Sequence, residues 1–529
     1  MDTVVQMPPS IDDGVVESGM PVSPATVHYR QIFARRSPAE LRTLAHIKRF
    51  MERLVGDQSF RAALAENLDN PRIVTDRYGI DVDPAQMLPL WKSAYLHHRT
   101  TPENSQWPLS ALWDEYMGEM IRHRDMLRDE GDAAAAHPRF HTWRERQIQR
   151  CNSELGGSAA SVTHPIIAFE LSEGCTVGCW FCGIAADRFK GHFAYTDDNA
   201  ALWRGAVTHA RELFGPAVRT GFCYWATDPC DNPDYDSFLF DYYRITGALP
   251  QTTTAAPLKN QALTRRIMAL FDRHRTVTNR FSILTTRQLD QIHAAFTPEE
   301  LMGVEMVMQQ KEALTAKAKA GRAEVRREKL REAGKSDKIS LVEHDHTTIA
   351  CVSGFLVNML RGRIQLVTPV PGSKRWPLGY RILGERFFKT AGEFRAGLES
   401  LIDAHMSIGM PSDRPLRFRA DLKYSPGDKS FTLQSRGAEH TINDAAGAVS
   451  IGELIARGAH TASQLITQAA TAGADILLVA DLIDQLFDAG LLEEDFDDTF
   501  AERQNEGMIM RAAALERAMA GAAPHAGPA

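Results

Sequence analysis

The chain has 529 residues, of which 44% are hydrophobic and 24% charged, with a formal net charge of −7 and seven cysteines. Such a composition is typical of a globular protein with several domains, and the acidic balance argues against general nucleic-acid binding. Seven cysteines are too few for a disulfide scaffold of this length. Residues 1–20 lack the apolar core of a signal peptide, and no run of about 18 apolar residues predicts a membrane span. We therefore expect a cytoplasmic protein that needs neither a membrane nor a nucleic acid.

The N-terminal part is expected to be disordered at first and then helical. Scattered Pro, Ser and Gly predict disorder over residues 1–28, and a helical domain is expected over 29–150. Its clearest helix begins at Ser37-Pro38-Ala39-Glu40, which combines a capping box with proline at the first helical position. Apolar residues then recur at helical spacing as far as Leu54.

From residue 164 onward, short apolar strands alternate with helices, which predicts a parallel α/β sheet. Six strands are expected, at residues 165–171, 221–225, a short third one leading to 250–254, 280–284, 303–308 and 348–357. Six strand–helix units suggest a partial (β/α)6 barrel of the TIM type over 160–380. Functional groups in such barrels lie at the C-terminal ends of the strands, so the polar residues there should converge.

Three cysteines follow the first strand with the spacing C-x3-C-x2-C: Cys175, Cys179 and Cys182. A [4Fe–4S] cluster is normally held by four thiolates, one on each iron, so three thiolates on one loop would leave one iron open. A structural zinc site would need a fourth ligand, usually from a second C-x2-C pair, and the chain has no such pair. A disulfide with a spare thiol would need an oxidising compartment. The loop, with the aromatic Phe181 before its last cysteine, therefore predicts an iron–sulfur cluster.

The segment Glu170–Gly183 resembles the signature of radical S-adenosylmethionine (radical SAM) enzymes. It is most similar to the radical peptide epimerases of ribosomal natural-product biosynthesis, the polytheonamide type, as are residues 226–235 and 348–355; the resemblance covers roughly 160–380. It implies a radical SAM barrel, a [4Fe–4S] cluster, S-adenosyl-L-methionine, and conversion of L- to D-residues in a ribosomally made precursor peptide. The 5'-deoxyadenosyl radical would take hydrogen from Cα, and a cysteine thiol would return hydrogen to the opposite face. A reducing system such as flavodoxin or ferredoxin would be a further partner.

The resemblance also implies contacts with S-adenosylmethionine. Asp228 stands where these enzymes carry a Gly-Gly-Glu segment that binds the cofactor's ammonium group, although a turn aspartate is an equal alternative. Thr253, Thr254 and Ser282 occupy positions that contact ribose or carboxylate, but their hydroxyls would equally satisfy strand ends. Phe181 is expected beside the adenine, with a core position as the alternative.

Four cysteines lie outside the triad, and Cys351 is the expected hydrogen donor. It sits on the predicted sixth strand, where period-two alternation gives it the same face as Phe355. The residues alone would make it a core cysteine, whereas the resemblance places the donor in the equivalent motif. Cys230, just past the second strand, is the alternative candidate for the hydrogen donor.

The C-terminal part predicts a separate module. A connecting helix is expected over 381–412 and a winged-helix-like domain over 413–496, with strands at 417–423 and 430–435 and helices around 451–455, from Thr461 and over 475–489. This order resembles the element that binds leader peptides in these pathways, where an extended peptide adds to a sheet edge. DNA binding is the competing interpretation, which the absence of Lys and Arg from the helix at Thr461 disfavours. The Ala-rich residues 497–529 are expected to fray, and residues 311–338 predict an exposed, salt-bridged helix.

Two other functions stay open. A different radical SAM enzyme would form a thioether or a carbon–carbon crosslink, but such enzymes usually need further cysteines, and none follows Cys351. A non-catalytic iron–sulfur sensor with a winged-helix output would release no deoxyadenosine when it is reduced with the cofactor.

Overall fold

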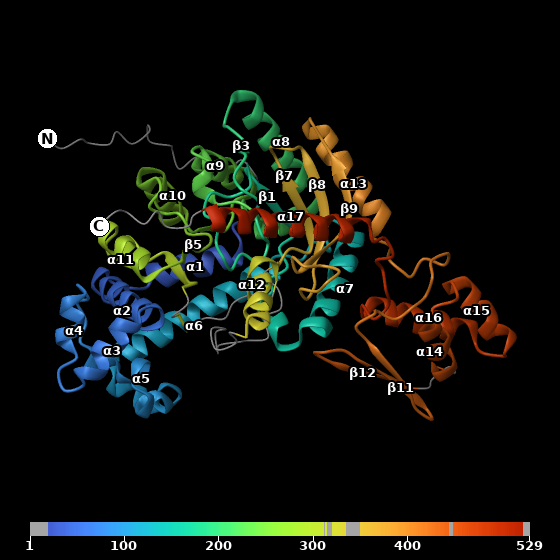
Figure 1. Ribbon diagram of the computed structural model, residues 1–529, viewed down its shortest axis with the longest axis horizontal. Helices are drawn as coiled ribbons and strands as arrows, with labels where there is room; N and C mark the ends of the chain where they lie inside the picture. The colour runs from blue at the N-terminus through green and yellow to red at the C-terminus, as the bar shows by residue number, and fades with distance from the viewer. Residues whose placement is uncertain (1–18, 311–312, 315–319, 335–349, 444–447, 522–529) are drawn as a thin grey trace.

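The computed structural model describes residues 19–310, 313–314, 320–334, 350–443 and 448–521. Residues 1–18 and 522–529, which fall in the segments expected to be disordered and frayed, lie outside this description. Figure 1 shows a helical lobe at the N-terminal end, a central part in which helices cover mixed sheets, and a small C-terminal lobe of strands and helices.

The N-terminal lobe consists of helices joined by short 3-10 turns. Its α-helices are α1 (Pro24–Ala34), α2 (Pro38–Gly56), α3 (Gln58–Glu66), α4 (Arg72–Arg77), α5 (Leu88–Trp91) and α6 (Pro108–Asp129). The predicted start of α2 is confirmed, because Ser37 and Glu40 form a reciprocal capping box around Pro38. Residues 19–28 were expected to be disordered, but α1 begins among them at Pro24 under a Ser23 cap.

Helix α7 (Pro138–Leu155) belongs to the central part, although the helical domain was expected to extend to residue 150. Its Phe140 and Trp143 are fully buried in the cluster that also holds Phe169 and Phe355 of the sheet. A separate cluster around Phe50 fills the N-terminal lobe. The side chains of α7 therefore join the larger apolar core.

The central strands form two sheets linked by a single bridging residue. One sheet has the order β1 (Ile167–Glu170), β7 (Gly354–Asn358), β8 (Arg363–Pro369), β9 (Tyr380–Phe387), and the other β4 (Thr252–Thr254), β5 (Asn279–Ile283), β6 (Val304–Met308). Phe222 bridges in parallel to Ala168 on one side and to Gln251 on the other, which links the sheets. Residues 221–225, expected to form the second strand, thus contribute only the isolated bridges of Phe222.

The sixth predicted strand lies beside the first. Strand β7 pairs in parallel with β1, Ile167 opposite Phe355, whereas β8 and β9 continue antiparallel. The parallel segments therefore lie side by side in the order β6, β5, β4, the Phe222 segment, β1, β7, and the described strands do not close into a barrel. The short pair β2 (Ser172–Glu173) and β3 (Gly191–His192) lies beyond the end of β1.

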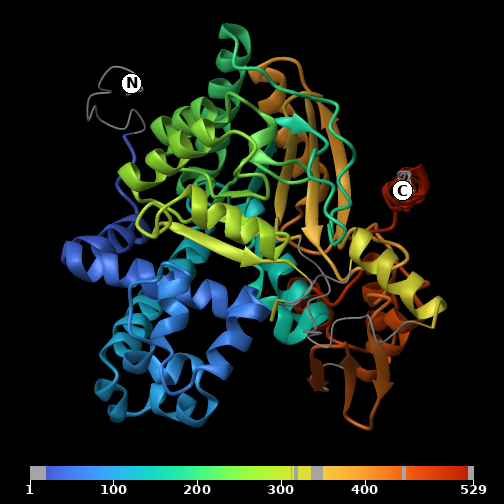
Figure 2. The same ribbon diagram turned by 60° about the vertical axis from the view of Figure 1, so that its left-hand side comes forward.

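Helices line the sheets along one side, as the green and yellow-green ribbons of Figure 2 show. They are α8 (Asp197–Phe214), α9 (Tyr235–Thr246), α10 (Gln261–His274) and α11 (Thr286–Ala295). Helix α13 (Ala391–His405) comes later in the chain, and α12 (Gly321–Glu332) lies apart from this layer. Residues 381–412 were expected to form one connecting helix. They hold most of β9 and then α13, which packs on β9 and α8.

The C-terminal lobe has three strands followed by three helices. The antiparallel sheet has the order β10 (Lys423–Pro426), β11 (Ser430–Gln434), β12 (Glu439–Asn443), and α14 (Ala448–Arg457), α15 (Ala462–Thr471) and α16 (Ile476–Asp488) follow. The predicted starts of the last two helices are confirmed, with Thr461 and Asp475 as N-caps. The expected strand at 417–423 was wrong: β10 begins only at its last residue, and β12 was not predicted.

Helix α17 (Thr499–Gly521) corrects the prediction of a frayed tail over 497–529. It leaves the C-terminal lobe and runs back across the central sheets (Figure 1), where Ala501 and Met508 join the buried cluster of Val367 and Tyr380. Across the part of the chain that the structure describes, no helix combines the length and apolarity that crossing a membrane requires.

Candidate functional site

The three cysteines lie on the loop after β1, where all three side chains are partly exposed. Two of their sulfurs accept backbone hydrogen bonds: Val177 N–H donates to Cys175 Sγ at 3.4 Å and Ala186 N–H donates to Cys182 Sγ at 3.5 Å. Burial raises the pKa of Cys175 and of Cys179 to about 12, and the other two thiols add to the effect at Cys179. The loop thus gathers three thiols within electrostatic range of one another, which is the donor chemistry of an iron–sulfur cluster.

Among the residues described, no three His, Cys, Asp or Glu side chains form a group that could hold a metal ion. A four-iron cluster attaches each thiolate to a different iron, so its ligands need not converge on one point as they do around a single ion. The residues present fit a cluster by the type and spacing of their donors.

Polar contacts anchor the first half of the cysteine loop. Asp231 accepts hydrogen bonds from Thr176, N–H at 2.9 Å and Oγ1 at 2.6 Å, and also pairs with Lys259. Glu173 forms ion pairs with Arg361 and Lys190. These contacts attach the loop to the segment after Phe222 and to the turn after β7.

Helix α12 anchors the second half of the loop. Arg322 donates from Nε to the Cys179 carbonyl at 2.9 Å, from Nη1 to the Ala186 carbonyl at 2.8 Å, and from its backbone N–H to the Cys182 carbonyl at 3.0 Å. The helix was predicted over 311–338 as an exposed surface; residues 311–312, 315–319 and 335–338 lie outside the description, but its first turn is packed against the loop. Only the fold brings Arg322 there, and no sequence signal distinguishes it from the other basic residues of the helix.

Glu170, at the end of β1, is a functional candidate that was not predicted from the sequence. Its carboxylate is 5% exposed and accepts from Ala226 N–H at 3.0 Å and from Asn358 Nδ2 at 2.9 Å. Burial raises its pKa, and the two donors oppose that rise. An acidic residue that ends a fully apolar strand was a visible signal, since buried carboxylates need a specific reason.

Asp228 is enclosed in a local network. It accepts from Thr254 Oγ1 at 2.7 Å, from Ala255 N–H at 2.7 Å and from Cys230 N–H at 2.9 Å, and is 4% exposed. Burial raises its pKa, against these hydrogen bonds. Cys230 Sγ lies 3.3 Å from the same Thr254 hydroxyl, whose one hydrogen goes to Asp228. The structure therefore joins three predicted site residues, Asp228, Thr254 and Cys230, in one buried cluster.

Thr253 points to the opposite face from Thr254, as alternation along a strand requires. It donates to Tyr224 Oη at 2.9 Å and accepts from Gln251 Nε2 at 3.1 Å. Ser282 is half-buried on β5. Arg280, two residues earlier on the same strand, lies directly opposite Thr253 in the strand register. Thr253 and Ser282 are thus on one face, and Thr254 is not.

Phe181 contacts Trp180 edge to face, with ring centroids 5.4 Å apart, and is half-buried on the cysteine loop. Arg326 of α12 lies over the Trp180 ring at 4.7 Å, so the cation–π contact adds a further tie between helix and loop.

Cys351 lies three residues before β7, at the N-terminal ends of the parallel strands, and not within the strand as expected. It packs against the cluster of Ala350 and Val352, which Cys182 also contacts, whereas Phe355 belongs to a different cluster. The predicted shared face with Phe355 is therefore wrong, because Cys351 precedes the paired strand and packs against other clusters than Phe355 does. Burial raises the pKa of Cys351 to about 12, against the influence of Arg280, so the thiol keeps its hydrogen at neutral pH.

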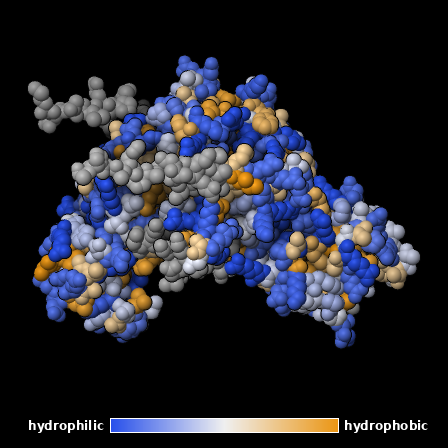
Figure 3. Space-filling view, viewed as in Figure 1, coloured by the Kyte–Doolittle hydropathy of each residue, from blue (hydrophilic) through white to orange (hydrophobic). Residues whose placement is uncertain are grey.

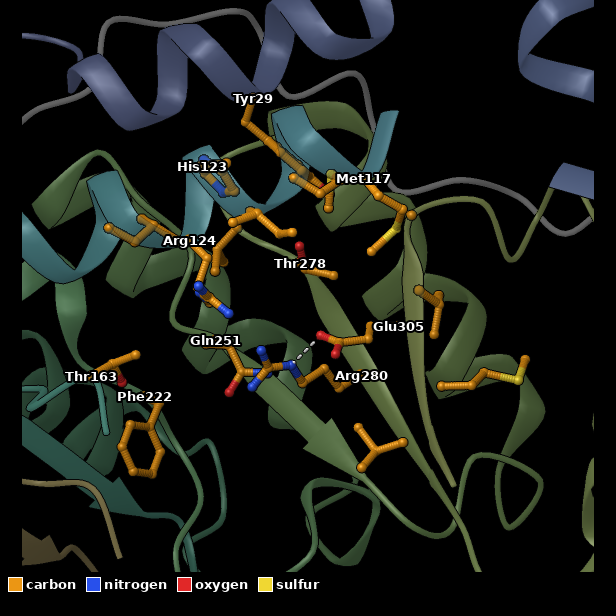
Figure 4. A pocket seen from close by; sticks show the side chains of 18 of the residues that line it. Tyr29, Met117, His123, Arg124, Thr163, Phe222, Gln251, Thr278, Arg280 and Glu305 are labelled. Atoms are coloured by element: carbon orange, nitrogen blue, oxygen red, sulfur yellow. Dashed lines mark hydrogen bonds and ion pairs between the residues drawn. The ribbon is translucent and has the colours of Figure 1, made fainter. Parts of the chain in front are cut away.

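Cys351 also lines a cavity of about 540 Å³ between α2 and α6 of the N-terminal lobe and the strands β5 and β6. Gln251, Arg280 and Glu305 point toward it in Figure 4. The cysteine triad and Cys351 thus stand at opposite ends of the parallel strands β1 and β7.

The C-terminal lobe exposes apolar side chains at the start of α16. Ile476, Leu477 and Leu478 are 51%, 78% and 47% exposed. Figure 3 shows apolar patches on this lobe amid an otherwise hydrophilic surface. Strand β12 is largely exposed and pairs, within the described residues, with β11 alone.

Comparison with known proteins gives two matches. The family described as the protein y4wI C-terminal domain matches residues 416–490, which span β10 to α16. The whole chain is similar to a protein of Sinorhizobium fredii described as "Uncharacterized protein y4wI", with 61% identity over 484 residues, or 92% of this chain and 94% of the relative.

Proposed function

The chain belongs to the family of protein y4wI, and from its site we propose that it is a radical SAM peptide epimerase that converts L- to D-residues in a ribosomally made precursor peptide. Cys175, Cys179 and Cys182 would hold a [4Fe–4S] cluster, which with S-adenosylmethionine supplies the radical that removes hydrogen from the substrate Cα. The protein would act in the cytoplasm with a flavodoxin or ferredoxin as reductant.

The position of Cys351 carries this proposal. Inversion needs hydrogen to leave one face of Cα and to arrive on the other. A substrate in the cavity would have the cysteine triad beyond the C-terminal ends of the strands and Cys351 at their N-terminal ends. The S–H bond of Cys351 would break and a Cα–H bond would form, and the resulting thiyl would regain one electron from the reductant and one proton from water. A protonated thiol, and not a thiolate, is the form that can give a hydrogen atom.

We propose that the remaining predicted residues support the cofactor. Thr253 and Ser282 carry their hydroxyls on the same face of the sheet as Arg280, whereas Asp228 binds Thr254 and the backbone of Ala255 at the end of β4. Phe181 would border the adenine, and Asp228 would act by ordering the end of β4.

The C-terminal lobe would bind the leader part of the precursor. A three-stranded antiparallel sheet followed by three helices leaves β12 at an edge, and an extended peptide can add there through main-chain hydrogen bonds. The apolar side chains at the start of α16 offer further contact area.

Co-expression with the precursor peptide in deuterated water tests the proposal. We expect deuterium at Cα of new D-residues with the wild type, and none with Cys351→Ala. Cys151→Ala is the matched control, since Cys151 is fully buried in the same small cluster that Cys351 contacts. Crosslinked or mass-shifted peptide without D-residues would refute epimerisation, and reduction with S-adenosylmethionine that yields no deoxyadenosine would refute radical chemistry altogether. Unimpaired epimerisation by Cys351→Ala would move the donor role to Cys230.

A further inference from the structure

The cavity beside Cys351 is built by two parts of the chain that are far apart in sequence. Helices α2 and α6 of the N-terminal lobe form one wall, and β5, β6 and the segment around Phe222 form the other. Its volume of about 540 Å³ is within the usual range for sites that enclose a small ligand, roughly 300–1,000 Å³. The N-terminal lobe therefore contributes half of a binding site and does more than support the fold.

Methionine is the most frequent apolar residue of the lining. Six of the 18 methionines of the chain face this one cavity: Met51, Met117, Met120, Met302, Met306 and Met308. Four of these side chains are only partly buried, so they have room to move within the cavity. Unbranched, polarizable methionine side chains adapt to apolar groups of different shape, which is why they are frequent at surfaces that accept several partners.

One ion pair of this lining lies on the strands β5 and β6. Arg280 Nε donates to Glu305 Oε2 at 2.7 Å across β5 and β6, as the dashed line in Figure 4 marks. The two side chains are 36% and 51% exposed, so both keep free hydrogen-bonding capacity toward the cavity. Arg280 also lies within electrostatic range of Cys351 and Tyr224. A guanidinium donor next to a carboxylate acceptor matches the carbonyl and N–H of a peptide group.

We propose that this cavity binds the peptide residue presented to Cys351 and selects apolar side chains, which the methionines enclose while Arg280 and Glu305 hydrogen-bond the flanking peptide groups. The inference rests on the proposed function for its peptide substrate, and it adds the class of residue that the site accepts. Charged side chains are disfavoured because acidic and basic side chains of the lining are already paired with each other, Lys48 with Glu52 and Arg280 with Glu305, and burial of an unpaired charge is costly.

Binding of blocked tripeptides to the full-length protein without cofactors tests this selection. The probes are N-acetylated, C-amidated Gly-Leu-Gly, Gly-Met-Gly, Gly-Asp-Gly and Gly-Lys-Gly, with affinities measured by titration calorimetry or ligand-observed NMR. We expect the two apolar peptides to bind at least about tenfold more tightly than the charged ones. Equal affinity for all four peptides, or no binding of the apolar ones, would overturn the proposal.

Variants locate the effect in the cavity. Met117→Asp is expected to lower the affinity for Gly-Leu-Gly about tenfold. Met510→Asp is the matched control, since Met510 is 66% exposed on α17, and it should bind as the wild type does. Met117→Ala enlarges the cavity without introducing a charge, so it should shift the preference from Gly-Leu-Gly toward Gly-Phe-Gly. This variant tests the cavity even if Met117→Asp fails to fold. Identical behaviour of the Met117 and Met510 variants would contradict the assignment.

The two proposals fail in distinguishable ways. Apolar-selective binding without deuterium incorporation would leave the inference standing and remove the epimerase. Epimerisation with equal rates at apolar and charged residues would support the epimerase and refute the selection of apolar side chains.

Discussion

Replacing Arg322 with alanine tests whether α12 holds the cysteine loop. The side chain makes two charge-assisted hydrogen bonds, to the carbonyls of Cys179 and Ala186. Hydrogen bonds from charged groups contribute about 1.5–3 kcal/mol each, and we take the low end because Arg322 is only half-buried. The backbone bond to Cys182 survives the change. We therefore expect the docked loop to lose about 3 kcal/mol, which corresponds to a roughly 140-fold rise in its open population.

Hydrogen–deuterium exchange of the loop, residues 174–188, measures this population directly, and its result does not depend on a bound cluster. Arg331→Ala is the matched control, because Arg331 lies on the same helix, is 52% exposed and, within the described residues, pairs with Glu324 at 3.5 Å. After reconstitution, the Arg322 variant should also lose its cluster absorbance to a chelator faster than the control. Equal exchange and equal cluster loss in both variants would refute the anchoring role of α12.

Three further predictions concern the frame around the site. Burial lowers the pKa of His164 from 6.5 to about 3, so its contribution to stability is complete above pH 6.5 and is lost as the pH falls toward 3. Between pH 6.5 and 5 the wild type should lose about 2 kcal/mol of its free energy of unfolding, measured by denaturant melts. His164→Asn should not show this loss, and asparagine tolerates the positive φ of 49° at this position. The same pH dependence in both proteins would contradict the role of His164. Gly354→Ala should lower the free energy of unfolding by about 3 kcal/mol or more, because φ is +154° and a Cβ would collide with the Ile166 carbonyl; a wild-type melting temperature would contradict this. Arg419→Ala should cost about 3–5 kcal/mol and expose the C-terminal lobe to protease, because its fully buried guanidinium bonds the Gly490 carbonyl and pairs with Glu154; unchanged cleavage would argue against that role.

Local features of the fold were predictable because they depend on neighbouring residues. The capping box at Ser37 and the caps at Thr461 and Asp475 follow from side chains that bond backbone groups two or three residues away. The positions of β1, β5 and β6 followed from short apolar runs, whereas β4 consists of three threonines at the expected end of the third strand. The predictions over 381–387, 417–423 and 499–521 failed because exposed or antiparallel segments carry a weaker pattern.

The candidate site was predictable only in part. The cysteine triad is contiguous, so its spacing alone predicts the chemistry of its ligands. The contacts of Glu170 with Asn358 and of Arg322 with Cys179 join residues more than a hundred positions apart, and the cavity likewise combines distant segments. No local sequence pattern predicts which glutamate or arginine will make such contacts.

The sequence by itself determined the thiols, the starts of α2, α15 and α16, and the positions of β1, β5, β6 and β11. The tertiary structure decided that β7 pairs with β1, that α12 and α17 return to the central part, and that Cys351 opens into a methionine-lined cavity at the strand ends opposite the triad. The reason is the range of the forces involved. Caps and ligand spacings are set within a few residues, whereas strand partners and cavities are chosen by the burial of apolar surface contributed from the whole chain.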